Sequence, residues 1–516
     1  MARTRWSALA ASALIQCFAG SSYCFAIYSP ALKASQSYDQ SSLDAVAFFK
    51  DVGANAGILS GFLAAWAPAG RRRPWLVLLA GAALCAAGYL PMWLAVTGLA
   101  PAPLPLVCLY MLLAAQAQTF LNTADVVTAV ENFPDRRGTV IGIMKGFLGL
   151  SGAILVQVYH TFHIAPSTFV LMLAILPTGI TLLLMYFVDV HSSHQRYNKK
   201  FIDAFSLIAV TVAGYLMIVI ICDRVFVISS AVQSVCFVIL LMLVLSPVAI
   251  AVRAQKSEPV KQEEERIGLL DGESSAAVEG CQQDLWSGKE NLNLVQAMCK
   301  LNFWLLFLAM ACGMGSGLAT VNNMSQIGGS LGYTTKETNT LVSLWSIWNF
   351  SGRFGAGYMS DHFLRQRGVG RPFFIGATLL MMSLGHAVIS SGLPAALYIG
   401  SVVVGLCYGC QWALMPSITS EIFGLNHFGT IFNMVAVASP VGSYILSVRL
   451  VGYIYDMESP PPPAAAACSG NHCFALSFII MACVCVLGSA VAFLLFIRTR
   501  TFYRRLVYAR LQPSFL

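Results

Sequence analysis

Residues Thr168–Val188 read TFVLMLAILPTGITLLLMYFV, a run of 21 residues without a charged side chain. A bilayer requires about 20 apolar residues in a helix, because its hydrocarbon core cannot satisfy bare backbone groups. The rest of the chain has the same character. Of its 516 residues, 57% are hydrophobic and only 10% are charged, whereas soluble domains carry about 25% charged residues. This composition excludes a soluble or disordered chain and predicts a polytopic, all-α membrane protein.

Fourteen stretches of this kind follow one another in groups of six, two and six. They are Trp6–Tyr28, Asp44–Trp66, Trp75–Thr97, Pro105–Val130, Thr139–Tyr159, Thr168–Val188, Phe201–Ile221, Phe226–Val252, Lys300–Asn322, Thr338–Ser360, Pro372–Ser391, Pro394–Pro416, Gly429–Tyr453 and Ala475–Ile497. We therefore expect about 14 membrane-spanning helices.

The basic residues predict the orientation of these spans. If the N-terminus is cytosolic, 25 of the 31 Lys and Arg residues fall on the cytosolic side, where the loops of inserted helices retain positive charge. Both termini are therefore expected in the cytosol, and the net charge of +8 reflects topology rather than nucleic-acid binding. Arg3 and Arg5 precede the first span, which lacks an obvious cleavage site and is predicted to be an uncleaved helix. The plasma membrane or the vacuolar membrane is the expected location.

The two groups of six spans repeat one another. Gly61 corresponds to Gly357, and Glu131 corresponds to Glu421, at equivalent places and in the same order along the chain. Two related halves in one membrane are typical of transporters, in which the substrate binds between the halves near the midplane.

This repeat divides the chain into five regions. We expect an N-terminal six-helix bundle (1–190), a two-helix insert (191–252), a flexible acidic cytosolic linker (253–298), a C-terminal six-helix bundle (299–497) and a cytosolic tail (498–516).

The linker contains a candidate sorting signal. Glu265 is followed by Leu269 and Leu270, the spacing of an acidic dileucine motif that a sorting adaptor would bind. So short a pattern also arises by chance, and both interpretations stay open.

Several words of sequence resemble the major facilitator superfamily and, more narrowly, the plant nodulin-like or nuclear-fusion-defective-4-like proteins. They include FKDVGANAG (49–57), RRGTV (136–140), SQIG (325–328), GRF (352–354) and the pair Ser360-Asp361. The resemblance covers essentially the whole chain except the linker. It implies the major facilitator fold and a transporter whose cargo the family does not define.

The resemblance also implies a cytoplasmic gating motif, a Gly-x-x-x-Asp turn followed by basic residues. The second half matches it with Gly357, Asp361 and Arg365, but the first half has Ala65 where the acid belongs. The acid is thought to bind helix dipoles that hold the gate shut, so this departure puts the gate of the first half in doubt.

Arg353 lies two turns before Asp361 and is predicted to pair with Glu421. Glu131 is the counterpart of Glu421 in the first half. The pair and Glu131 are either part of the gate or purely structural.

Asp125 and Lys145 fall inside predicted spans, where a lipid-facing ion is costly. Asp125 precedes Glu131 by six residues and Lys145 follows Gly138 by seven, so both lie about 10 Å deep at 1.5 Å per helical residue. We expect them to form an ion pair. The pair either couples transport to protons or solute, or only locks two helices together.

Further polar residues are candidates for the wall of a central cavity. They are Gln118 and Asn122, which share a helical face with Asp125, Asn322 at the end of a span, and the cluster Tyr408, Gln411 and Trp412. The alternative is that they only pack helices together or hydrogen-bond within the bundle.

Cys468 and Cys473 flank His472 in a predicted outside loop, where oxidation is possible. We expect a local disulfide, and metal binding with His472 is the weaker alternative. No Ser/His/Asp set, phosphate loop or zinc motif is recognisable, so we expect no enzyme, no cofactor and no metal.

The sequence therefore predicts a secondary transporter in the lipid bilayer that moves a small polar or anionic solute by alternating access, with protons as a candidate coupling ion. The alternative is a membrane sensor or scaffold that keeps the fold but transports nothing.

Overall fold

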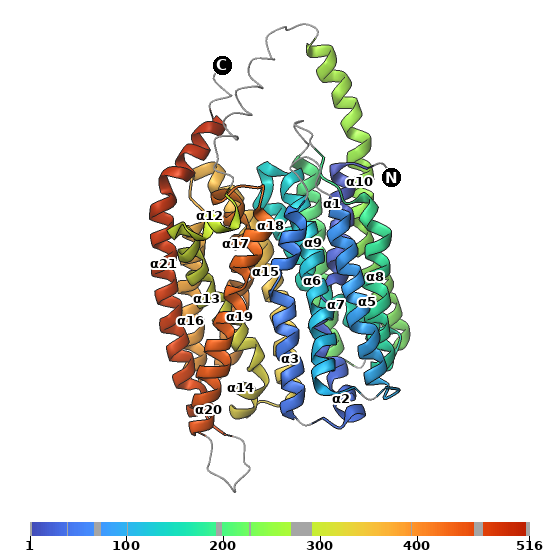
Figure 1. Cartoon of the computed structure of the whole chain (residues 1–516), viewed down its shortest axis with the longest axis vertical. Coiled ribbons are helices and arrows are strands. Elements are labelled where there is room, and N and C mark those ends of the chain that lie inside the picture. The colour runs from blue at the N-terminus through green and yellow to red at the C-terminus, as the bar shows by residue number, and fades with distance from the viewer. Residues whose placement is uncertain are drawn as a thin grey trace.

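The computed structural model describes residues 3–38, 40–66, 74–100, 102–191, 199–226, 229–269, 292–393, 395–458 and 468–511. All regular secondary structure within these ranges is helical, which confirms the all-α prediction. Figure 1 shows the helices running nearly parallel in one bundle. The helix α1 begins, and α21 ends, at the same end of the bundle, which we call the inner end; the opposite end is the outer end.

Among the described residues, the N-terminal half contains eight α-helices, and the insert adds two. They are α1 (Arg5–Ala19), α2 (Phe25–Gln36), α3 (Gln40–Asn55), α4 (Ile58–Ala65), α5 (Pro74–Val96), α6 (Leu104–Asn132), α7 (Arg137–Thr161) and α8 (Pro166–Leu184), followed by α9 (Lys199–Val225) and α10 (Ser230–Leu269).

The C-terminal half follows after the linker. It consists of α12 (Leu294–Met298), α13 (Leu301–Asn322), α14 (Met324–Ser330), α15 (Thr335–Arg367), α16 (Pro372–Ser390), α17 (Ala396–Ile422), α18 (Phe428–Ala436), α19 (Ala438–Ser443), the π-helix η4 (Tyr444–Val451), α20 (Gly452–Glu458) and α21 (His472–Leu511).

Among the described residues, eleven helices are long and apolar enough to cross a membrane, or twelve if the bent pair Arg5–Cys24 and Ile27–Gln36 is one span. Two predicted spans do not reach that criterion. One is α3 with α4, which is interrupted at Gly57, and the other is α15, which carries Arg353 and Asp361. Fourteen spans stay a prediction.

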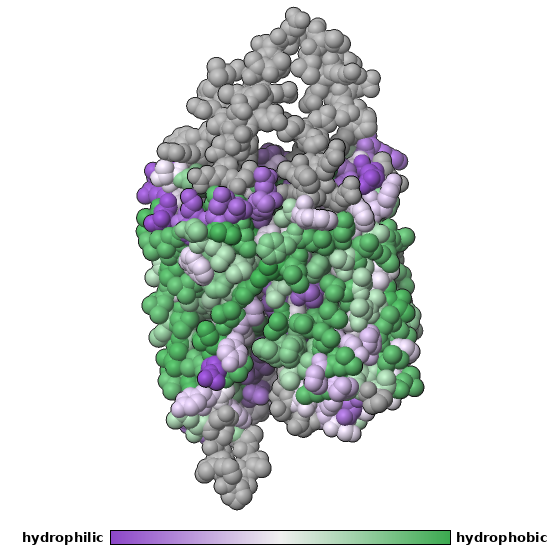
Figure 2. Space-filling view, in the orientation of Figure 1, coloured by the Kyte–Doolittle hydropathy of each residue, from purple (hydrophilic) through white to green (hydrophobic). Residues whose placement is uncertain are grey.

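The surface of the bundle agrees with a membrane location. Figure 2 shows a broad hydrophobic belt around the molecule and hydrophilic side chains gathered at the inner end. In the outer half of the same face, a furrow with hydrophilic side chains lies between the two halves. A belt of this kind is the surface that lipid covers.

Local sequence explains where α15 begins and where it ends. The Thr334 hydroxyl accepts a hydrogen bond from the Glu337 backbone N–H (3.3 Å), and the Glu337 carboxylate accepts one from the Thr334 N–H (2.8 Å). This reciprocal capping box starts the helix. Gly368 ends it with φ of +64°, a left-handed conformation that favours glycine.

The insert packs against the N-terminal half, where α10 contacts α1 and α9 contacts α7, and α9 also reaches α15 of the other half. Near the inner end, Arg136 forms an ion pair with Asp203 of α9 (3.3 Å). The insert therefore covers the line along which α7 meets α15.

Two helices run past their predicted ends. The helix α10 continues to Leu269, into the segment predicted to be the linker, and α21 continues into the predicted tail as far as Leu511. Both extensions are rich in Glu, Gln, Lys or Arg, whose helix propensity is high. The predicted sorting signal extends to Leu270, which lies outside the described residues.

Candidate functional site

Two basic side chains from different halves meet in the middle of the bundle. Lys145 of α7 is 2% exposed and Arg353 of α15 is 3% exposed. The Arg353 guanidinium donates one hydrogen bond from Nη1 to the Lys145 carbonyl (3.0 Å) and one from Nε to Asn349 Oδ1 (2.9 Å). These bonds fix the guanidinium against the partner half.

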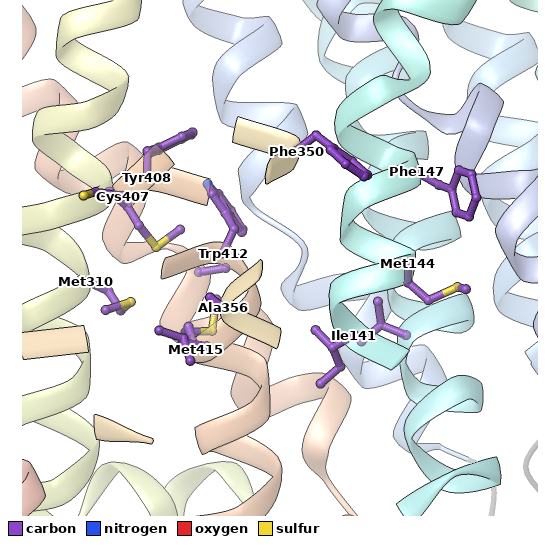
Figure 3. Packing of buried hydrophobic residues seen from close by; sticks show 14 of the residues in the cluster. Ile141, Met144, Phe147, Met310, Phe350, Ala356, Cys407, Tyr408, Trp412 and Met415 are labelled. Atoms are coloured by element: carbon purple, nitrogen blue, oxygen red, sulfur yellow. The ribbon is translucent and has the colours of Figure 1, made fainter. Parts of the chain in front are cut away.

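Aromatic rings complete this cluster. The Lys145 Nζ lies 5.1 Å from the ring centre of Trp412 and 5.0 Å from that of Phe432, and the Arg353 Cζ lies 5.8 Å from the Trp412 ring. Figure 3 shows Tyr408 and Trp412 on α17, across from side chains of α7. We call Lys145, Arg353, Trp412 and Phe432 the central cation site.

No carboxylate among the described residues forms an ion pair with either cation. Removing an ion from water costs several kcal/mol even after relaxation, whereas a cation–π contact returns only about 0.5–2 kcal/mol. The two positive charges are thus poorly compensated by the protein. Chemically, the site is suited to hold an anion.

The predicted pair of Asp125 and Lys145 does not form. Asp125 Oδ2 accepts a hydrogen bond from Gln16 Nε2 of α1 (2.8 Å), while Oδ1 has no hydrogen-bond partner. The sequence places the two residues at equal depth, but it does not fix the rotation of α6, which turns Asp125 toward α1. Asp125 is therefore a fully buried carboxyl group held in the N-terminal half.

Two other predicted cavity residues, Gln118 and Asn122, lie on α6 with Asp125. Gln118 accepts a hydrogen bond from Ser22 Oγ (2.5 Å), and its Nε2 is 3.5 Å from the Tyr23 hydroxyl. Asn122, one turn further along α6, is also buried, and its Oδ1 lacks a hydrogen-bond partner. These residues lie between Asp125 and the outer end of α6.

The predicted cluster on α17 is split between two faces. Tyr408 and Trp412 are four residues apart and contact each other, but Gln411 donates to the Met382 sulfur (3.5 Å), inside the C-terminal half. Asn322 is exposed at the end of α13. Of this group, only Tyr408 and Trp412 belong to the centre between the halves.

A second polar cluster closes the inner end. Asp361 Oδ2 accepts hydrogen bonds from the backbone N–H and the hydroxyl of Thr139 (both 2.6 Å), and its Oδ1 accepts one from the Gly138 N–H (3.2 Å). These donors lie in the first turn of α7, where the helix dipole favours a negative charge. The acid of the C-terminal half thus holds the start of a helix in the N-terminal half.

Arg371 extends this contact. Its Nη2 donates to Asp361 Oδ1 (2.6 Å), its Nε donates to Glu421 Oε1 (2.9 Å), and the Tyr503 hydroxyl donates to Glu421 Oε2 (3.0 Å). Burial lowers the pKa of Arg371, but the carboxylates of Glu421 and Asp361 outweigh it and raise that pKa above its ordinary value. We call Asp361, Arg371, Glu421 and Tyr503 the inner clamp.

The predicted pair of Arg353 and Glu421 is therefore wrong. Glu421 belongs to Arg371, and Arg353 points toward Lys145 instead. Arg365, the basic residue of the motif, donates to the Asp135 carbonyl.

Glycines allow the halves to approach at the inner clamp. A Cβ added to Gly138 would lie 2.7 Å from the Gly357 carbonyl oxygen, which no real side chain tolerates. In the first half, a Cβ on Gly61 would lie 2.6 Å from Thr430 Cα of α18. The two crossings are related by the repeat, but Ala65 supplies no acid at the second. Glu131, the counterpart of Glu421, is half-buried in the last turn of α6.

Sequence reasoning missed several of these residues. Arg371-Pro372 in the second half corresponds to Arg73-Pro74 in the first, but nothing in the sequence indicates that the Arg371 side chain joins two acids. Gln16, Phe432 and Tyr503 carry no motif, and only their positions in the fold connect them to the two clusters.

The outer loop contains the expected bridge. Cys468 and Cys473 are joined by a disulfide, with their Cα atoms 6.0 Å apart. The Gly470 N–H donates to the Ser330 carbonyl (2.8 Å), and Asn471 donates to the Ser390 carbonyl (2.9 Å). The loop therefore ties the outer ends of α14 and α16. His472 is adjacent, but sulfur in a disulfide is not the thiolate that binds metals.

Alkylation of Cys468 and Cys473 tests this bridge. In sealed vesicles that expose the outer end, a membrane-impermeant maleimide is expected to label neither residue until a reductant is added, because the disulfide leaves no thiolate to react. Mass spectrometry of the loop peptide provides the measurement. Labelling without reductant would refute the disulfide, and Cys299, which is exposed and not bridged, serves as a reactive control from the inner side.

Two family models match consecutive parts of the chain. The nodulin-like model matches residues 5–252, and the model of the NFD4 C-terminal domain matches residues 289–505. Lys145 lies within the first match, whereas Arg353 and the inner clamp lie within the second.

Relatives and solved structures agree with these matches. The chain is 26% identical over 539 residues to the protein NUCLEAR FUSION DEFECTIVE 4 of Arabidopsis thaliana, covering 97% of this chain and 90% of that protein. It is 25% identical over 221 residues to the probable transporter MCH1 of Yarrowia lipolytica, with 41% of this chain and 45% of that protein covered.

Two solved structures share the fold. The proton:xylose symporter XylE has a TM-score of 0.56 at 12% identity and covers 94% of each chain. The transporter FucP in the outward conformation has a TM-score of 0.51 at 14% identity, covering 96% of this chain and 99% of its own. These similarities show that the chain adopts the major facilitator fold.

Proposed function

Because the chain belongs to the nodulin-like family of the major facilitator superfamily, we propose that it is a secondary active transporter of a small anionic solute. The observation that carries the proposal is the central cation site, where Lys145 and Arg353 lie buried between the halves without a carboxylate partner among the described residues. An anion bound there would neutralise charges that the fold leaves poorly compensated. The names of MCH1, XylE and FucP are those of transporters, which agrees with the prediction that the chain is not an enzyme.

The positions of the two clusters support the proposal of alternating access. The inner clamp joins the halves at the inner end, and the central cation site lies further from that end. In the proposed cycle, the solute enters from the outer end, binds both halves through one cation of each, and leaves after the clamp opens. Positive charge at the inner end supports the proposal that this end faces the cytosol.

Asp125 is the proposed site of coupling to protons. It is fully buried, and it lies beside Gln16 rather than beside a cation. Burial of a lone carboxylate is costly, so protonation offers a means to neutralise this group during the cycle.

The Asp125→Asn variant tests the coupling. The amide keeps the size and the contact with Gln16 but cannot exchange a proton, so we expect uptake that no longer rises as the outer pH falls. Initial uptake into proteoliposomes, measured across a series of outer pH values, checks this. Asp203→Asn, which removes an exposed acid near the inner end, is the control. A pH profile of Asp125→Asn that matches the wild type would remove Asp125 from the coupling.

The solute itself can be found with the purified full chain in proteoliposomes. A panel of labelled monocarboxylates, dicarboxylates, amino acids and hexoses, assayed with and without a pH gradient, should show uptake confined to anions. Uptake of hexoses alone would refute the anion proposal. Anions that raise the melting temperature of the protein but are never accumulated would favour the sensor or scaffold.

A further inference from the structure

The halves meet along two lines at the inner end, and the two are unequally closed. Where α7 meets α15, the acid Asp361 binds the first turn of α7, and α9 lies alongside. Where α4 meets α18, Gly61 brings the backbones together, but Ala65 provides no acid. Among the described residues, the second line therefore lacks an ionic contact like the one that holds the first.

A groove lies beside this second line. Its volume is about 640 Å³, and its lining is almost entirely apolar. One wall is formed by Leu59, Phe62, Leu63 and Ala65 of α4 and by Trp66, which directly follows that helix. The other is formed by Leu294 and Val295 of α12 together with His427 and Thr430 near the start of α18. Both walls carry highly exposed apolar side chains, since Leu59 is 67%, Trp66 is 79% and Val295 is 71% exposed.

The position of the groove indicates what fills it. The helices α12 and α18 lie close to the inner end of the bundle (Figure 1), where the hydrophobic belt meets the hydrophilic side chains (Figure 2). Tryptophan is enriched at that depth of a membrane, which suits an exposed Trp66. A groove with apolar walls at the edge of the belt is accessible to lipid tails and offers little to a polar solute.

We propose that this groove binds one acyl chain of a phospholipid from the leaflet at the inner end. Its walls belong to different halves, since α4 is part of the N-terminal half and α12 and α18 are part of the C-terminal half. An acyl chain bound between them would join the halves by apolar contact at the place where the acid is missing. The lipid would then favour the state with the inner end closed, because a ligand stabilises the state that it binds better.

Native mass spectrometry of the purified full chain tests the binding. Phosphatidylcholine is added to delipidated protein, and the retained lipids are counted. Ala65→Phe, which fills the groove from the α4 wall, and Val295→Phe, which fills it from the α12 wall, are each expected to lose one phospholipid. Leu183→Phe on α8 is the matched control, because Leu183 is exposed and apolar but lies outside the groove. Unchanged retention in both groove variants would overturn the site.

The bridging role has a separate readout. Asp361→Asn weakens the other line of contact without touching the groove. If the groove needs both halves in their closed positions, this variant should retain the phospholipid less well than the wild type; equal retention would refute the bridge between halves. The part of the inference that concerns gating rests on the proposed alternating access, but the lipid count does not require transport. A lipid count that shows no binding would therefore refute the lipid site without bearing on the proposed transport, which the uptake assay tests.

Discussion

Lys145→Gln and Arg353→Gln are each expected to reduce uptake of the transported anion at least about 30-fold. Loss of one partner from a buried, hydrogen-bonded charge pair costs about 2–5 kcal/mol, and each 1.4 kcal/mol corresponds to about tenfold in affinity. Initial uptake of the anion identified by the solute panel is the measurement. Lys256→Gln removes a basic residue that is exposed on α10, and it should transport like the wild type.

The same two variants are expected to be more stable than the wild type. Each removes a buried cation that lacks a carboxylate partner among the described residues, and therefore removes its desolvation cost. A melting temperature in detergent that rises while uptake is lost would identify charges kept for function at the expense of stability. If the variants unfold at a lower temperature, the two cations are structural, and the anion proposal fails.

Arg353→Lys separates charge from shape. Lysine keeps the positive charge but loses the planar guanidinium that contacts Lys145, Asn349 and Trp412. Arginine and lysine are not equivalent where several hydrogen bonds and ring stacking hold the group. We therefore expect uptake between that of the wild type and that of Arg353→Gln.

The hydrophobic pattern was sufficient to predict an all-α membrane protein. Long apolar runs leave few alternatives to helices in a membrane, and the order of Gly61, Glu131, Gly357 and Glu421 gave the correspondence of the halves. The family resemblance added the acid Asp361, which the structure places at the start of α7. Predictions of this kind depend on the spacing of residues along one helix, so they do not require the rotation of one helix relative to another.

Predictions about partners required the rotation of each helix about its axis, which the sequence does not fix. Asp125 and Lys145 lie at similar depth, yet Asp125 faces α1 and Lys145 faces α17 and α18. In the same way, Gln411 is turned away from Tyr408 and Trp412 although it lies beside Trp412 in sequence. A buried ion in a bundle has several neighbouring helices, and only packing decides which of them provides its contact.

Arg371→Met is expected to destabilise the protein by about 3–5 kcal/mol, the usual cost of leaving a buried charge without its partner. Here one arginine serves two acids, so its loss leaves both Asp361 and Glu421 uncompensated at the inner end. The free energy of unfolding in mixed micelles measures the effect. Arg367→Ala, at the exposed end of α15, should change that energy by less than about 0.5 kcal/mol.

A triple variant distinguishes the clamp from simple packing. When Asp361→Asn and Glu421→Gln accompany Arg371→Met, no charge of the inner clamp is left unpaired, and much of the lost stability should return. Transport should not return with it, because neutral side chains bind the first turn of α7 less strongly than the carboxylate of Asp361 does. The inner end would then open more readily, and a maleimide supplied from that side should label an introduced Ser420→Cys faster than it does in the wild-type background. If the triple variant is as unstable as Arg371→Met alone, the guanidinium acts through its volume and not through its charge, and the inner clamp is not an ionic gate.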